Sequence, residues 1–335
     1  MGEIAHRSTS PFYGLGEFSA IIGMTQCLTY EFCPDRLSPH RNGETVDPNA
    51  PATRLLVETD WLAHHLVDPS IRIVDIRGII RPPDAPRPHY FGNRSAYLES
   101  HILEAVFVDW TADITEPGAP VKMTLAGPGR FAALMGQLGI GDEHIVVVYE
   151  DGAGHIAARL WWALNYYGHP AVKLLNGGFR KWTAEGRPVT AEIPRHQPAG
   201  FTPRIQPGWR AATADVRAAM GDPSVMLVDL RSPPEFHGEI GRGKRKGRIP
   251  GACNVPMATL VSGECKTFNS EADLRQAFEA AGVTFDKRAI TYCNAGVAAA
   301  LGLFALTLIG HPAAANFAGS WYEWEHDPQN PVATG

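Results

Sequence analysis

The chain has 335 residues, more than one ordinary domain needs and about right for two. Hydrophobic residues make up 44% and charged residues 19%, which is typical of a globular protein rather than a disordered one. The net charge of −5 argues against a nucleic-acid partner, and no apolar run reaches the roughly 20 residues that a membrane span needs. Five cysteines are too few for a disulfide framework, so we expect a reducing, cytoplasmic location.

Residues 1–52 differ from the rest of the chain. Proline and glycine interrupt them, and they follow neither the period of a helix nor that of a strand. They lack the marks of a secretory signal, and an Arg-rich transit peptide is a poor match. Cys27 and Cys33 have no histidine at metal-ligand spacing, so we interpret them as incidental. We expect an N-terminal extension that is loosely ordered on the remainder of the protein.

The remainder of the chain repeats itself. The paired segments are IVDIR at 73–77 with LVDLR at 227–231, EAVFV at 104–108 with GACNV at 251–255, IAARLWWALNYYGH at 156–169 with AAALGLFALTLIGH at 298–311, and GGFRKW at 177–182 with GSWYEW at 319–324. This spacing indicates two copies of one domain rather than a solenoid. We predict a first domain at 53–188, a proline-rich linker at 189–208 and a second domain at 209–335.

Each copy alternates strand and helix signals. The first copy has predicted strands at 71–76 and 145–149 and predicted helices at 130–138 and 156–167, and the second has strands at 225–230 and 289–292 and helices at 274–281 and 297–309. The glycines that follow these helices, at 139, 168, 282 and 310, are placed as caps. The alternation predicts an α/β fold in which each domain is a mostly parallel sheet flanked by helices. Such sheets bind ligands at the carboxyl ends of their strands.

One cysteine stands where chemistry is expected. Cys293 follows the buried run that ends at Tyr292, and a turn of small residues and a predicted helix come next. Main-chain N–H groups can converge in such a turn, and the helix N-terminus adds positive potential, so an anion such as a thiolate is stabilised there. The alternative is a buried structural cysteine. We predict that Cys293 is the nucleophile and that substrate is held by Asn294, Ala295, Gly296, Val297 and Ala298.

The matching place in the first copy has no thiol. Tyr149 is followed by EDGAGH at 150–155, one residue more than in the second copy. The carboxylates of Glu150 and Asp151 would oppose an anion at this point. We therefore expect the first domain to be catalytically inactive and to complete the cleft.

With these motifs, residues 53–335 resemble a tandem rhodanese-domain sulfurtransferase, the family of thiosulfate and 3-mercaptopyruvate sulfurtransferases. The motifs that carry the resemblance are VDIR and VDLR, SHILEAVFVDW and GRIPGACNVP, the Trp pair at 161–162, NGGFRKW, AGSWYEW and CNAGVAA. The resemblance implies two rhodanese-like domains, a persulfide on Cys293, a small-molecule sulfur donor and a thiophilic acceptor such as cyanide or a thiol, including that of a protein. It implies no metal and no organic cofactor.

The choice of donor rests on departures from the family pattern. Members that prefer thiosulfate often have basic residues after the cysteine, and this chain has Asn294 and Ala295. Members that prefer 3-mercaptopyruvate tend to hold its carboxylate with an arginine, and the corresponding residue here is Glu235. A guanidinium binds a carboxylate specifically, so the absence of an arginine at residue 235 is the stronger of the two indications. We therefore expect thiosulfate as the donor, with 3-mercaptopyruvate as the alternative.

The sequence is compatible with one other functional class and disfavours a second. A non-catalytic persulfide carrier remains open. A cysteine phosphatase of similar fold needs an arginine six residues after its cysteine, where this chain has Ala299, so phosphate chemistry is disfavoured.

A basic stretch at 242–248 is a further candidate for binding an anion. It ends at Arg248, just before Ile249–Pro250–Gly251. We predict that Arg248 contacts the substrate, the alternative being a solvated basic loop.

Overall fold

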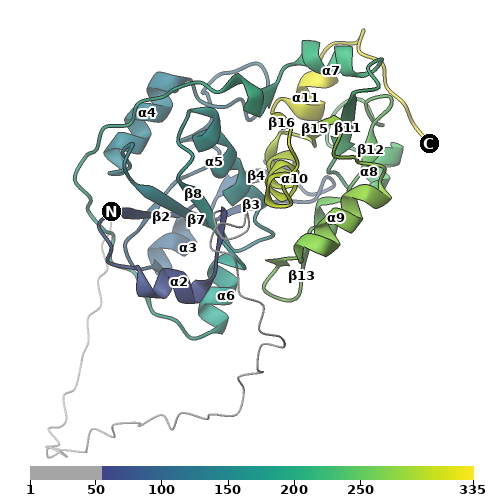
Figure 1. Cartoon of the computed structure of the whole chain (residues 1–335). Helices are drawn as coiled ribbons and strands as arrows, with labels where there is room; N and C mark the ends of the chain where they lie inside the picture. Colours follow the sequence, from purple (N-terminus) through teal and green to yellow (C-terminus); the bar gives the residue numbers. More distant parts are fainter. Residues whose placement is uncertain (1–54) are drawn as a thin grey trace, which may run out of the picture. The chain divides into compact units, whose positions relative to one another are not determined.

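Two parallel β-sheets organise residues 55–335, which are the residues that the computed structural model describes (Figure 1). Residues 1–54, which include the expected extension with Cys27 and Cys33, lie outside the described residues. The strands of the first sheet are β1 (Leu56–Val57), β2 (Ile71–Asp75), β6 (Ala105–Phe107), β7 (Ile145–Tyr149) and β8 (Val172–Leu175). Those of the second are β10 (Arg210–Ala211), β11 (Val225–Asp229), β12 (Cys253–Asn254), β15 (Arg288–Tyr292) and β16 (Ala314–Phe317).

The two sheets have the same strand order. It is β1-β8-β7-β2-β6 in the first and β10-β16-β15-β11-β12 in the second. All neighbouring strands within them are parallel. The registers correspond as well, since Asp75 pairs with Tyr149 and Asp229 with Tyr292. The duplication and the parallel sheets predicted from the sequence are therefore confirmed.

The helices cover the sheets. They are α2 (Thr59–His64), α3 (Arg94–Glu99), α4 (Pro128–Gln137), α5 (His155–Tyr166), α6 (Gly178–Ala184), α7 (Thr213–Ala219), α8 (Pro233–His237), α9 (Glu271–Ala280), α10 (Val297–Leu308) and α11 (Ser320–Trp324), with 3₁₀ turns η2 (Pro207–Trp209) and η3 (Met257–Thr259). The four predicted helices are present within three residues of their expected ends. The four expected capping glycines all have left-handed φ angles of 73–85°. Among the described helices, none has the length and apolar character to cross a membrane.

Three short antiparallel ladders complete the strands: β3 (Gly78–Ile80) with β4 (Tyr90–Gly92), β5 (His101–Ile102) with β9 (Val189–Thr190), and β13 (Val261–Ser262) with β14 (Thr267–Phe268). The predicted linker begins in β9 and ends in η2, and residues 191–206 between them form neither helix nor strand.

Both faces of each sheet are buried, as continuous apolar strands require. In β7, Val146 and Val148 pack in the cluster that contains α4 and α5, whereas Val147 and Tyr149 pack with residues of α2 and α6. This alternation follows from the two-residue period of a strand.

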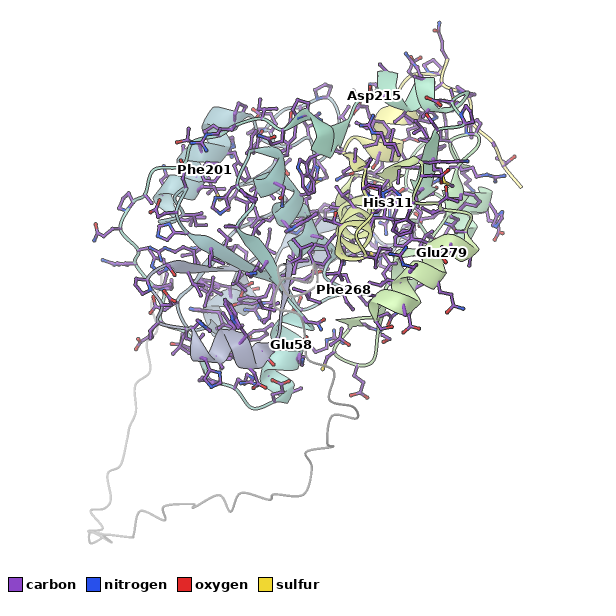
Figure 2. All side chains as sticks on the ribbon, viewed as in Figure 1. Glu58, Phe201, Asp215, Phe268, Glu279 and His311 are labelled. Atoms are coloured by element: carbon purple, nitrogen blue, oxygen red, sulfur yellow. The ribbon has the colours of Figure 1, made fainter. Side chains whose placement is uncertain are left out.

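The two domains share one hydrophobic cluster. Helices α5 and α10 lie side by side where the domains meet, and residues of both belong to the same buried core (Figure 1). Phe268, labelled in Figure 2 between the two halves, packs its ring 5.1 Å from that of Phe304, and its N–H donates to Asn176 of the first domain at 3.0 Å. This packing brings the first residues of α5 and α10 to one cavity.

Candidate active site

A cavity of about 270 Å³ lies at the carboxyl ends of the strands of the second sheet. The second domain contributes Leu230, Arg231, Ser232, Pro233, Glu235, Arg242, Pro256, Met257, Ala258, Cys293, Asn294, Ala295, Val297 and Ala298 to its wall. The first domain contributes Ile80, Tyr90 and His155. The cysteine loop and the first domain therefore face the same space.

Cys293 is held firmly at the end of β15. Its side chain is buried, with 4% exposure. Its N–H donates to Ser320 Oγ at 3.0 Å, and its carbonyl accepts from the Trp321 N–H at 3.0 Å. Ser320 has a left-handed φ of 51°, where a non-glycine residue is strained, and its hydroxyl donates to the Phe317 carbonyl at 2.7 Å. The main chain of the cysteine is thus fixed from α11.

The carbonyls of residues 293–296 all point outward from the loop. They accept, in order, from the Trp321 N–H at 3.0 Å, the Tyr322 N–H at 3.0 Å, Arg159 Nη1 at 3.3 Å and Asn316 Nδ2 at 3.1 Å. In a planar trans peptide the N–H points opposite to the preceding carbonyl, so the N–H groups of residues 294–297 turn to the inner side. Within residues 55–335 none of these four N–H groups donates to a protein acceptor. The loop therefore offers a row of free donors to an anion.

The turn depends on Gly296, which does not line the cavity. It has a left-handed φ of 74°, and a Cβ there would lie 2.3 Å from the Ala318 carbonyl oxygen. A side chain would push the loop away from the main chain of Ala318, so only glycine fits.

Glu235 braces the loop from α8. Its carboxylate accepts from Asn294 Nδ2 at 2.9 Å and from the Ser232 hydroxyl at 2.8 Å. The same oxygen that holds Asn294 lies 3.8 Å from Arg242 Nε. The Glu235 carboxylate therefore lies in the cavity wall, hydrogen-bonded to Asn294 and Ser232 and close to the guanidinium of Arg242.

Arg248 lies away from the cavity. Its main chain pairs with Ala333, its guanidinium donates to the Gly335 carbonyl at 2.7 Å, and it lies 4.5 Å from the centre of the Phe236 ring. Because its main chain pairs with the C-terminal segment, Arg248 is not among the residues that line this cavity, and its contact with substrate stays a prediction. Arg242, from the same basic stretch, occupies the cavity wall instead.

The loop of the first domain is filled by its own carboxylate. Glu150 is 3% exposed, and its carboxylate accepts from the N–H groups of Ile156, at 3.3 Å, Gly154 and His155. Burial, followed by the charge of Asp151, raises the pKa of Glu150 to about 8. The cavity beside it measures only about 10 Å³. The extra residue predicted in this loop is confirmed, since α5 begins six residues after Tyr149 and α10 begins five residues after Tyr292.

The sequence analysis did not identify several neighbours of the loop: Tyr90, His155, Arg159 and Ser320. Arg159 had a readable signal, because the repeat aligns it with Leu301 and a charge in an otherwise apolar helix is unusual. The others come from separate elements and carry no local pattern.

The remaining described cysteines lack this setting. Cys253 and Cys265 are unpaired, as is Cys293. Burial raises the pKa of Cys253 to about 11, which keeps it protonated at neutral pH.

Comparison with known proteins places these features in context. The model of the rhodanese-like domain matches residues 58–185 and 212–327. The sulfur carrier protein TtuD of Thermus thermophilus is 35% identical over 294 residues, covering 84% of this chain and 97% of that protein. A putative thiosulfate sulfurtransferase of Mycolicibacterium smegmatis is 32% identical, covering 84% of this chain and 98% of that protein. The crystal structure of SseA from Escherichia coli, described as a 3-mercaptopyruvate sulfotransferase, superposes with a TM-score of 0.71 at 31% identity over 79% of this chain and 98% of that one.

Proposed function

Because the chain belongs to the family of proteins built from rhodanese-like domains, we propose that it is a thiosulfate sulfurtransferase that works through a persulfide on Cys293. One observation carries the proposal: Cys293 opens onto a cavity beside four inward N–H groups that no protein acceptor uses among the described residues. Such donors stabilise negative charge on sulfur without any rearrangement.

The reaction has two displacements. The Cys293 thiolate attacks the outer sulfur of thiosulfate, a bond forms between the two sulfurs, and the old sulfur–sulfur bond breaks with its electrons leaving on sulfite. Cyanide or an acceptor thiolate then attacks the terminal sulfur of the persulfide, and the electrons of that bond return to Cys293. The N–H groups of residues 294–297 hold the persulfide between the two steps.

The wall opposite the loop supports thiosulfate as the donor. The oxygens of thiosulfate lie only two bonds from the outer sulfur that Cys293 attacks, so the loop donors and Arg242 can reach them. The carboxylate of 3-mercaptopyruvate lies further along its chain and needs its own cation. The Glu235 carboxylate, bound to Asn294 and 3.8 Å from Arg242, opposes a second carboxylate in this wall.

We assign the active site to the second domain, residues 209–335, and treat residues 53–188 as an inactive copy joined to it by the linker at 189–208. The support is the Glu150 carboxylate, which uses the N–H groups of its own loop and leaves about 10 Å³ beside it. A cavity of that size has no room for thiosulfate.

The test is turnover with two donors on one preparation. Thiocyanate formation from thiosulfate and cyanide, compared with pyruvate release from 3-mercaptopyruvate, should give the higher kcat/KM for thiosulfate. Mass spectrometry after incubation with donor should find one added sulfur on the peptide that contains Cys293. A higher kcat/KM for 3-mercaptopyruvate would contradict the assignment of thiosulfate as the donor. A persulfide that forms without turnover of either donor would support the alternative of a non-catalytic persulfide carrier.

A matched variant sharpens the donor assignment. Glu235→Gln keeps one acceptor oxygen for Asn294 and replaces the oxygen at Ser232 with an amide that can donate to that hydroxyl. Because the negative charge is removed, kcat/KM for 3-mercaptopyruvate should rise more than that for thiosulfate. An unchanged ratio of the two efficiencies would show that this carboxylate does not select the donor.

A further inference from the structure

A buried arginine of the first domain lies against the cysteine loop. Arg159 is 0% exposed and sits on α5, one turn after His155. Its guanidinium donates to the Ala295 carbonyl at 3.3 Å and to the Met123 carbonyl, and its Nε has no partner. Burial lowers the pKa of Arg159 to about 10, so the group still carries its charge at neutral pH.

This charge has no carboxylate partner among the residues that the structure describes. The charged groups that act on it are Cys293, whose thiolate favours the guanidinium form, and Arg210, which opposes it. Keeping a cation buried without an anion costs several kcal/mol, so such a group is not retained for packing alone. A negative sulfur on Cys293 would supply the missing counter-charge.

The other charged groups around Cys293 are balanced. Arg231 is paired with Asp229 at 2.5 Å, and Arg242 lies 3.8 Å from Glu235. Burial lowers the pKa of His155 to about 4, which leaves this imidazole neutral at pH 7.

The two phenols near the loop stay neutral too. Burial raises the pKa of Tyr90 and that of Tyr322 above the ordinary value, and their hydroxyls lie 3.1 Å apart. With Glu150 also largely protonated at pH 7, Arg159 is the uncompensated charge on the loop within residues 55–335.

We infer that Arg159 is a positioning residue of the first domain that stabilises the anionic sulfur of Cys293, both as thiolate and as persulfide. It does so through its charge and through the Ala295 carbonyl, which it pulls outward so that the Gly296 N–H turns inward. The stabilisation is reciprocal. One electrostatic interaction favours both the charged form of Arg159 and the charged form of Cys293, and it contributes the same free energy to each. The inference rests on the proposed role of Cys293, and it gives the inactive first domain a part in the chemistry.

The test measures the alkylation rate of Cys293 by iodoacetamide against pH, followed on its own peptide by mass spectrometry. Arg159→Met removes the charge and should move the midpoint of this profile upward by about one pH unit, a roughly tenfold loss of thiolate below the midpoint. Arg159→Lys keeps the charge and should leave the midpoint near that of the wild type. Arg210→Met removes a neighbouring charge that makes no bond to the loop, and it serves as the matched control.

A purely structural role gives a different pattern. If Arg159 only holds the Ala295 carbonyl, the lysine and methionine variants should lose thermal stability and leave the midpoint unchanged, and that result overturns the inference. Where Arg159→Met does not fold, Arg159→Gln replaces it, since the amide can still donate but is neutral. The alkylation profile needs no donor, so a failure of the proposed sulfur transfer would be seen separately in the turnover assays.

Discussion

The loop after β7 and the loop after β15 occupy the same place in two copies of one domain, yet their main-chain N–H groups are used in opposite ways. In the first domain the Glu150 carboxylate turns into its own loop and takes the N–H groups of Gly154, His155 and Ile156. In the second domain the corresponding N–H groups are unused by protein acceptors in the described chain, and Cys293 opens onto a cavity. The comparison shows that the parallel sheet determines where the loop lies. A small first residue and unoccupied N–H groups are what allow the loop to bind an anion.

The largest effect is expected at the thiol itself. Cys293→Ser should lower thiocyanate formation by at least about a thousandfold, because no persulfide can form on a hydroxyl. The variant should keep the thermal midpoint of the wild type, since the side chain changes little in size. Detection of the added sulfur on Cys253 or Cys265 would assign the reaction to another cysteine.

A thiol alone should not make the first-domain loop active. In a Cys293→Ser background, Glu150→Cys should leave turnover at the level of the single variant. The loop is one residue longer, its cavity measures only about 10 Å³, and Asp151 remains beside it. Persulfide formation on the new cysteine would show that position at the end of a strand is sufficient.

A smaller effect is expected from the hydroxyl that holds the main chain of the cysteine. Ser320→Ala leaves the buried Cys293 N–H without its acceptor, at a cost of about 1–3 kcal/mol in unfolding free energy, and should lower kcat/KM about tenfold. Ser320→Gly loses the same bond but relieves the left-handed φ of 51°, so it should be about 1 kcal/mol more stable than the alanine variant. The first domain has Gly178, with φ 53°, at this position. Chemical denaturation of the two variants is the measurement, and equal stabilities would mean that residue 320 is not strained.

The smallest effect concerns pH. The pKa of Glu150 is raised to about 8 in the folded state, so between pH 4.5 and 8 the native state binds more protons and stability falls as pH rises. Glu150→Gln removes this loss and should melt a few degrees above the wild type at pH 8, with the difference shrinking toward pH 5. Glu143→Gln, at a carboxylate that is 70% exposed, is the control. A difference that does not change with pH would mean that Glu150 is ionised in its loop throughout.

The sequence predicts the local parts of this molecule well. Central strands, long helices and the cysteine loop follow from consecutive residues, and the repeat doubles each signal. Helices α6 and α11 were not predicted, because they are short and begin at small residues after a glycine. The prediction for Arg248 follows from the basic stretch that it ends, just before Ile249–Pro250–Gly251, but its pairing with Ala333 is a long-range contact that no local pattern reveals.

The cluster shared by α5 and α10 also bears on how the two copies can be separated. Residues such as Trp161 and Phe304, whose rings lie 4.9 Å apart, would lose their cover if either half were removed. Each domain would then lose roughly 25 cal/mol of stabilisation for each Å² of apolar surface that becomes exposed to water. The halves should accordingly melt in one calorimetric transition, and the second domain expressed by itself should be insoluble although it contains the whole cysteine loop. Each domain thus completes the buried core of the other.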